Sequence, residues 1–115
     1  MNARRKPGSR TRFVRGSGNV FADVGLPNPE EALAKARLAE AIADAIDRGN
    51  FTQADTAAML GVDQPKVSKI VNGRLDGFTQ DRLIRYLRAL GGDVEIRIRA
   101  PKQGRGVGRL TVTTD

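Results

Sequence analysis

The stretch from Gln53 to Asn72, which reads QADTAAMLGVDQPKVSKIVN, constrains this chain more than any other part of its sequence. Its pattern predicts two short helices that meet at a sharp turn. Gly61 stands where the chain must reverse, because a glycine adopts a positive φ without the penalty that a Cβ would carry. Ala57 is small enough to let the two helix backbones approach each other. Apolar side chains are expected to form the inward face of the pair at Leu60, Val62, Val67 and Ile70.

Residues at the start of both helices match helix-capping signals. Thr52 is a good N-cap for the first helix, and Asp55 follows three residues later, as in a capping box. Asp63 is the expected cap of the second helix. Pro65 falls in the first turn of that helix, where its missing N–H costs little because those donors have no partner anyway. We expect the second helix to end at residues 72–73.

The second helix is expected to turn a polar, donor-rich side outward. A helix fits the major groove of DNA, and the residues at its N-terminus meet base edges. Gln64 can exchange two hydrogen bonds with adenine, Pro65 offers an apolar face to a thymine methyl group, and Lys69 can donate to guanine. Ser68 lies one turn beyond Gln64 and can contact a base or a phosphate. This is the layout of a DNA-reading helix-turn-helix.

Further residues of the motif are candidates for contact with DNA phosphates. Gln53 opens the first helix, and helix N-termini attract anions. The other phosphate candidates are Lys66, Asn72 and Arg74. Alternatively, the polar residues of the second helix form an ordinary solvent face, and Asn72 equally suits a helix end. We favour DNA contact because the whole two-helix pattern fits, and not one residue alone.

Helical patterns flank the motif on both sides. The upstream helix is expected to begin at the cap Asn28, with Pro29 in its first turn, and to run to about Arg48, with Gly49 as its stop. Its apolar stripe consists of Leu38, Ile42 and Ile46, with Ala41 and Ala45 beside it. The downstream helix begins after the cap Thr79 and ends at residues 91–92. Its apolar side consists of Leu83, Ile84, Leu87 and Leu90.

The period of the pattern changes to two between Asp93 and Arg99. Val94, Ile96 and Ile98 fall on one face, and Glu95, Arg97 and Arg99 fall on the other. This alternation predicts a half-buried strand. A lone strand needs a partner for its backbone groups. That partner is either residues 109–114 of the same chain, in a hairpin, or the same strand of a second subunit across a two-fold axis.

Most of the net positive charge of the chain lies before the helical region. The chain has a formal net charge of +7, and six of its basic residues fall within residues 1–20, which contain no acid. Residues 1–18 are rich in Arg, Gly and Ser and cannot bury enough surface to order themselves, so we expect a disordered basic arm. This arm is either a solvated tail, a contact to DNA phosphates or the minor groove, or a segment that orders against a protein partner. Residues 20–26 form a small apolar cluster that we expect to pack on the domain.

Several classes of function are disfavoured by composition. The chain contains no cysteine and no histidine, which excludes disulfides, thiolate chemistry, imidazole bases and the usual zinc sites. We expect no cofactor and no metal. No apolar run approaches the roughly 20 residues that cross a bilayer, so we expect no membrane association and a cytoplasmic protein. An enzyme is disfavoured because no nucleophile–base pair or phosphate-cradling loop can be assembled; the glycines of residues 104–108 lack the strand-to-helix context.

The motif QADTAAMLGVDQPKVSKIVNGR resembles the helix-turn-helix of the phage Cro/repressor or Xre-type family. The resemblance covers about residues 33–90 and implies base or phosphate contacts at Gln53, Gln64, Lys69 and Arg74. SGNVFADVGLPNPEEALAKARLAEAI and ALGGDVEIRIR further resemble small Xre-type regulators of the HigA-like antitoxin group. Members of that group repress their own operon as dimers and bind a toxin encoded beside them, typically an mRNA endonuclease. The basic arm and the glycine-rich tail depart from this compact pattern.

The sequence thus predicts a mainly α fold: a four- to five-helix Cro/repressor-like helix-turn-helix domain with a C-terminal β-strand or hairpin. The expected organisation is a disordered arm over 1–18, a DNA-binding domain over 19–92, and a strand or hairpin over 93–115 that serves dimerisation. The predicted function is a sequence-specific repressor without enzymatic activity, binding double-stranded DNA as a homodimer, with a toxin as a further partner. The alternative is a protein-binding module whose helix-turn-helix is mainly a scaffold.

Overall fold

The computed structural model describes residues 28–104 and 106–115. The predicted basic arm and the predicted apolar cluster of residues 20–26 lie outside these described residues. The chain divides into two units, Met1–Ala32 and Leu33–Asp115. Of the first unit only residues 28–32, the cap and first turn of a helix, are described. The fold below is therefore that of the second unit.

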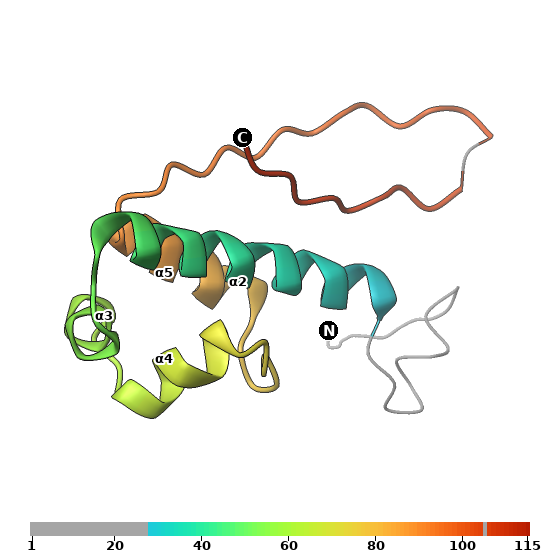
Figure 1. Ribbon diagram of the computed structural model, residues 1–115. Helices are drawn as coiled ribbons and strands as arrows, with labels where there is room; N and C mark the ends of the chain where they lie inside the picture. Colours follow the sequence, from blue (N-terminus) through green and yellow to red (C-terminus); the bar gives the residue numbers. More distant parts are fainter. Residues whose placement is uncertain (1–27, 105) are drawn as a thin grey trace. The chain divides into compact units, whose positions relative to one another are not determined.

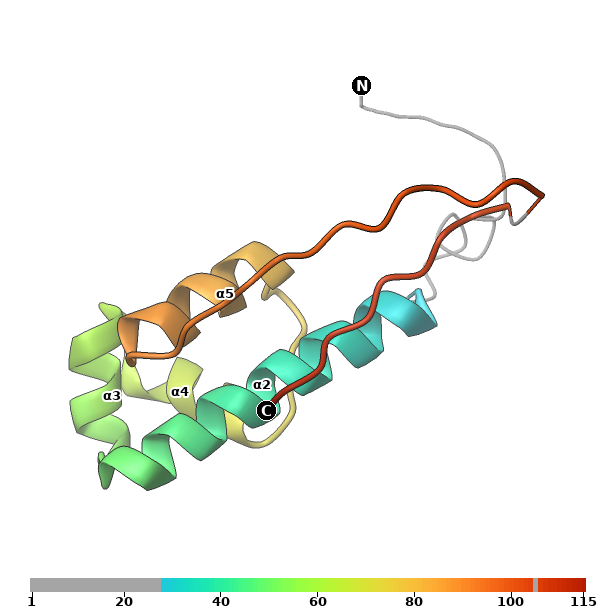
Figure 2. The same ribbon diagram turned by 90° about the horizontal axis from the view of Figure 1, so that it is seen from above.

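Four α-helices make up the described fold: α2 (Pro29–Gly49), α3 (Gln53–Leu60), α4 (Gln64–Val71) and α5 (Gln80–Ala89) (Figure 1). The short helix α3 packs against both α4 and α5. The same helices seen from above show that α3 and α4 point in clearly different directions (Figure 2). None of the described helices is long and apolar enough to cross a membrane.

One apolar core joins α2, α4 and α5. Its most deeply buried large side chains are Ile42 from α2, Ile70 and Val67 from α4, and Leu83 from α5, each at most 2% exposed. The rings of Phe78 and Tyr86 meet edge to face, with centroids 6.4 Å apart. The apolar stripe expected of α2 is confirmed, since Leu38, Ile42 and Ile46 are all buried. In α5 Leu83 is buried as expected, whereas Ile84, Leu87 and Leu90 pack on the core as partly buried side chains. Residues Leu60 and Val62 of the turn pack against this core as partly buried side chains.

Every predicted helix start is confirmed by a side-chain cap. The Asn28 carboxamide oxygen accepts from the Glu30 amide at 2.9 Å. Thr52 caps α3 in a reciprocal capping box with Asp55, and Asp63 and Thr79 cap α4 and α5. These caps satisfy amide donors that have no carbonyl partner within the first turn of a helix.

The end of α2 differs from the prediction in one respect. Gly49 is the last helical residue, and the left-handed conformation falls on Asn50, with φ of 55°. Asparagine tolerates this conformation better than most residues that carry a Cβ. Gly49 is needed for a different reason: a Cβ placed there would lie 2.3 Å from the Phe51 ring. The glycine thus makes room for an aromatic side chain that packs on the core.

The strand predicted over residues 93–99 is absent from the described single chain, whereas its pairing with a second subunit stays a prediction. Residues 93–104 and 106–115 contain no strand, although the chain turns back on itself near Gly104 and Gly106, which both have positive φ (Figure 2). Ile96 and Ile98 are 75% and 88% exposed. The alternating pattern is therefore present, but the described residues leave Ile96 and Ile98 of its apolar face exposed, while Val94 is half-buried. The described fold is all-α, without the expected strand or hairpin.

Candidate nucleic-acid interface

The turn between α3 and α4 sets the direction in which α4 leaves the core. Gly61 has φ of 70°, in the left-handed region, and Val62 donates its amide to the Ala57 carbonyl oxygen at 3.0 Å. These two features close α3 with the hydrogen bonds typical of a glycine-terminated helix. Ala57 is buried at 7% exposure and belongs to the apolar core. The turn role predicted for Gly61 is confirmed, and the close helix approach predicted at the buried Ala57 stays a prediction.

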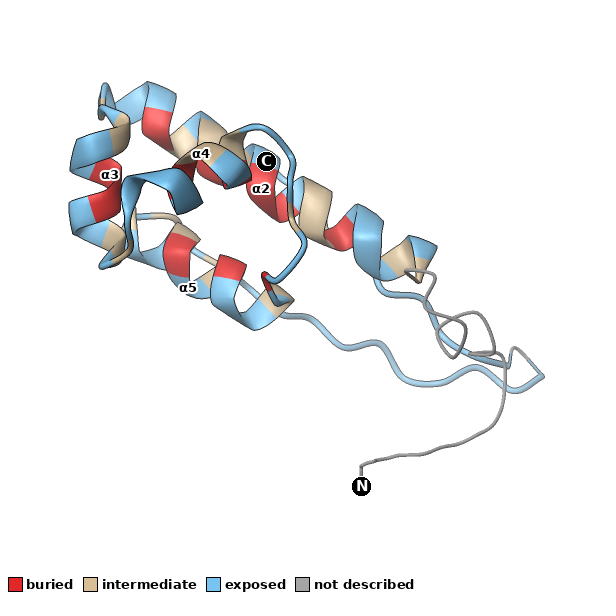
Figure 3. Cartoon of the chain, turned by 90° about the horizontal axis from the view of Figure 1, so that it is seen from below, coloured by how far each residue is buried: buried red, intermediate tan, exposed pale blue. Residues whose placement is uncertain are grey.

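Helix α4 has one buried side and one exposed polar side. Val67 and Ile70 are 1% and 2% exposed and hold the helix on the core. Figure 3 shows the opposite side of α4 as exposed. The residues on this exposed side are Gln64, Pro65, Lys66 and Lys69. We call these four residues the α4 face. Their side chains lie outside the core and are exposed.

The cations around α4 are not neutralised within the described chain. Among residues 28–104 and 106–115, no ion pair involves Lys66, Lys69 or Arg74. By contrast, Arg48 lies 2.9 Å from Asp44 and Arg85 lies 3.7 Å from Asp81. Exposed cations without acidic partners favour contact with a polyanion, because binding releases the counterions held by the phosphates.

A family model described as a helix-turn-helix domain matches residues 20–99, which is most of the chain. The chain belongs to this helix-turn-helix family. A solved structure titled "Putative XRE Family Transcriptional Regulator" is 45% identical, with a TM-score of 0.69, and the match covers 77% of this chain and all of that one. The helix-turn-helix protein is thus an Xre-type, DNA-binding regulator, from a family that is not enzymatic.

A curated relative carries a more specific name. "Putative antitoxin HigA3" of Mycobacterium tuberculosis is 40% identical over 75 residues, or 65% of this chain. The helix-turn-helix protein spans 66% of that relative's length. The predicted resemblance to HigA-like antitoxins is confirmed as homology.

Two of the predicted contact residues of the helix-turn-helix protein are engaged with each other. Asn72 is the C-cap of α4, and its side-chain amide donates to the Ser68 carbonyl oxygen at 2.9 Å and to the Ser68 hydroxyl at 3.3 Å. Ser68 is half-buried and is not part of the α4 face. The structure therefore gives Asn72 the helix-ending role that was one of its two interpretations. DNA contact by this pair stays a prediction.

The remaining phosphate candidates lie at both ends of the motif. Gln53 is the first residue of α3 and is half-buried. The cap uses the Asp55 amide, whereas the first amides of a helix, including that of Gln53, have no carbonyl partner within the helix. Arg74 follows α4, and its amide donates to the Lys69 carbonyl oxygen at 2.8 Å, which anchors the backbone of the exposed Arg74 side chain.

Sequence reasoning missed one residue that stabilises the motif. Thr56 is fully buried, and its hydroxyl donates to the Thr52 carbonyl oxygen at 2.9 Å. This bond satisfies a buried polar group next to Ala57. The available signal was the spacing of four residues between Thr52 and Thr56, at which a threonine hydroxyl reaches a helical carbonyl.

Proposed function

We propose that this protein is a sequence-specific DNA-binding repressor that acts in the cytoplasm as a homodimer and controls its own operon as the antitoxin of a toxin–antitoxin pair. The observation that carries the DNA-reading part is the α4 face, which stands clear of the core while Val67 and Ile70 anchor the helix. The dimer follows from the way helix-turn-helix proteins read two half-sites about one helical turn apart.

Within this proposal the residues have separate roles. Gln64 reads adenine, Lys69 reads guanine, and Pro65 meets a thymine methyl group. Lys66, Arg74 and Gln53 hold phosphates and so position α4 in the groove without reading sequence. Ser68 and Asn72 add polar groups at the C-terminal half of α4, where they contact the sugar–phosphate backbone.

The test begins with the operator, selected from random duplexes by the wild-type protein. Gln64→Ala and Lys69→Ala are then compared with Lys102→Ala, which removes an exposed lysine from the C-terminal segment. Each α4 variant should bind the selected site about 5- to 150-fold more weakly, equivalent to roughly 1–3 kcal/mol, and should relax one base position. An unchanged base preference in Lys69→Ala would refute the base-reading role of that lysine.

A second candidate function is that of a protein-binding module that masks a toxin. The 40% identity to a relative named as an antitoxin favours it. Two exposed apolar side chains, Leu33 and Met59, at 55% and 43% exposure, offer contact surface outside the α4 face. Co-expression with the product of the neighbouring open reading frame tests this function by co-purification.

The variant Gln64→Ala/Lys69→Ala separates the two functions. If both hold, the double variant loses operator binding and still captures the neighbouring protein. If the wild type captures the neighbouring protein but selects no operator, only the protein-binding function is supported. If the wild type binds an operator but captures no neighbouring protein, only the repressor function is supported.

A further inference from the structure

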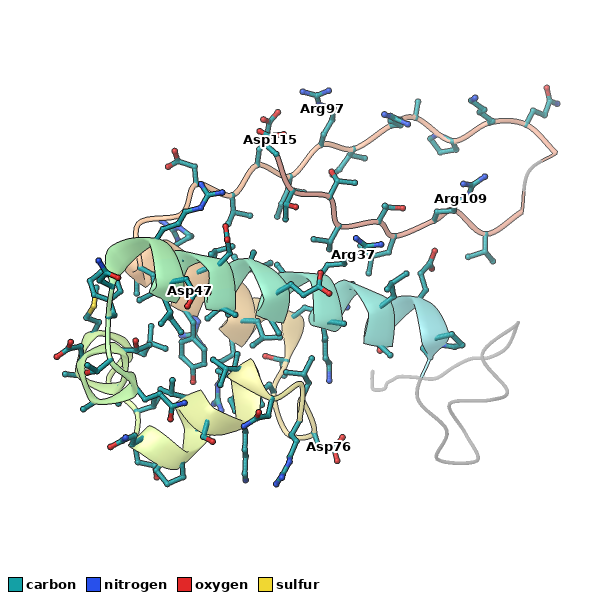
Figure 4. All side chains as sticks on the ribbon, viewed as in Figure 1. Arg37, Asp47, Asp76, Arg97, Arg109 and Asp115 are labelled. Carbon is teal, nitrogen blue, oxygen red and sulfur yellow. The ribbon has the colours of Figure 1, made fainter. Side chains whose placement is uncertain are left out.

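Residues 93–99 have the chemistry of a strand that lacks its partner. Their order is Asp-Val-Glu-Ile-Arg-Ile-Arg, with apolar and charged side chains in strict alternation. Ile96 and Ile98 are largely exposed, and the Arg97 guanidinium bonds the Glu95 carboxylate at 3.0 Å, which places both charged groups on the same side. Figure 4 shows Arg97 standing out from the extended segment into open space. The segment is thus extended and two-faced, with Ile96 and Ile98 exposed and Val94 half-buried.

The charged residues of this segment lie at equal distances on either side of Ile96, with opposite signs on the two sides. The acids Asp93 and Glu95 precede Ile96, and the bases Arg97 and Arg99 follow it at the same spacings. If a second copy runs antiparallel with the two-fold axis at Ile96, Glu95 faces Arg97 of the other copy and Asp93 faces Arg99. On the apolar face, Val94 meets Ile98, and Ile96 meets its own equivalent. Directly opposed pairs of these kinds are the ones that stabilise antiparallel strands.

Other registers of the two strands do not place opposite charges and apolar side chains against each other in this way. An axis at Arg97 places that arginine against itself, and an axis at Glu95 does the same with a carboxylate. If one strand shifts by one residue along the other, its apolar side chains lie opposite the charged side chains of the partner strand. A parallel pairing in register places every charge against its own kind. Like charges directly opposite each other are destabilising in a sheet.

The returning segment of the same chain is a poorer partner. Residues 106–115 contain a single acid, Asp115, for the two arginines of residues 93–99. No strand pairing between the two segments is present in the described residues. Val112 of the returning segment packs against the helical core instead.

We propose that residues 93–99 of two copies pair as antiparallel strands about a two-fold axis at Ile96, and that this pairing specifies the homodimer. The proposal rests on the dimeric repressor inferred above and names the surface and register of its dimerisation. Its apolar face buries Val94, Ile96 and Ile98 of both copies, and its charged face forms four cross-strand ion pairs. The exposed Glu95–Arg97 pair within one chain gives way to the pairs between chains.

Charge exchange provides the main test. In Glu95→Arg and in Arg97→Glu, each homodimer would oppose like charges at two positions, so its dissociation constant should rise at least about tenfold. A one-to-one mixture of the two variants restores opposite charges at both positions and should form heterodimers about as tightly as the wild type. The double variant Glu95→Arg/Arg97→Glu should again form homodimers. Sedimentation equilibrium and native mass spectrometry of differently tagged chains measure all four cases.

Cysteine crosslinking tests the direction of the strands, because the natural chain contains no cysteine. Under mild oxidation Ile96→Cys should crosslink with itself. Val94→Cys should not, but it should crosslink when mixed with Ile98→Cys. Efficient self-crosslinking of Val94→Cys would indicate a parallel pairing and overturn the proposed register. Unaltered dimerisation of both single charge variants would overturn the pairing itself.

These results are separable from the proposed function. Helical circular dichroism of the single-charge variants should match the wild type, because the substituted side chains lie outside the core, whereas their melting temperature should fall with the loss of the dimer. If the charge variants remain dimeric while Gln64→Ala and Lys69→Ala lose operator binding, the pairing fails and the repressor stands. If the charge variants dissociate but no operator can be selected for the wild type, the pairing stands and the repressor fails.

Discussion

Thr52 and Asp55 bond each other in both directions at the start of α3. The Thr52 hydroxyl oxygen accepts from the Asp55 amide at 2.9 Å, and the Asp55 carboxylate accepts from the Thr52 amide at 3.1 Å. The Thr52 carbonyl oxygen also accepts from the Thr56 hydroxyl. One surface threonine thus connects the cap of α3 to the buried side of the helix that supports α4.

Replacing Thr52 by alanine should destabilise the domain without touching the α4 face. The substitution leaves the Asp55 amide without its acceptor, which costs about 1 kcal/mol. For a domain of this size the melting temperature should fall by roughly 4–8 °C. Thermal unfolding measures the change, and Thr52→Ser, which keeps the hydroxyl, is the control that should retain most of the stability.

Gly61→Ala should destabilise the turn for a purely conformational reason. No atom lies within 4 Å of the position that a Cβ would take, but φ is 70°. The expected loss is therefore that of a left-handed alanine, roughly 1–2 kcal/mol in urea unfolding. Gly61→Asn should lose less, because asparagine adopts this conformation more readily. Equal losses in the two variants would point to a steric cause instead.

Gly49→Ala should be destabilising for the opposite reason. Alanine normally strengthens a helix relative to glycine by about 0.5–1 kcal/mol, but here the added methyl group would overlap the Phe51 ring. Displacing that ring should cost roughly 1–3 kcal/mol. In a Phe51→Ala background the same substitution should become neutral or stabilising. A double-mutant cycle by urea unfolding measures this coupling, and additive effects would contradict the predicted overlap.

Arg74→Ala should weaken the binding of all duplexes alike. A phosphate contact carries no sequence information, so the base preference should not change. The slope of log affinity against log salt concentration should become shallower by about one. Fluorescence anisotropy titrations over a range of salt concentrations measure both quantities.

The matched control for this measurement is Arg88→Ala. It removes the same charge from the last turn of α5. Its salt slope should stay close to that of the wild type. Loss of a single base preference in Arg74→Ala would instead assign that arginine to base reading.

Local signals in the sequence were sufficient for the helices and their caps. Thr52, Asp63 and Thr79 were identified as caps because a cap depends only on residues within one turn of it. The apolar spacing of Val67 and Ile70 likewise identified the buried side of α4. The exposed residues of the α4 face could therefore be named from the pattern, whereas the half-burial of Ser68 and its bonds with Asn72 could not.

The sequence by itself determined the two-helix motif, the positive φ at Gly61 and the two-faced pattern of residues 93–99, because each depends on neighbours along the chain. Only the tertiary structure decided that Gly49 makes room for Phe51, that the left-handed residue after α2 is Asn50, and that Ile96 and Ile98 remain uncovered. These features depend on which distant groups meet in space. A strand in particular needs a partner for its backbone and a cover for its apolar face. The described residues form no strand pairing with residues 93–99 and leave Ile96 and Ile98 exposed.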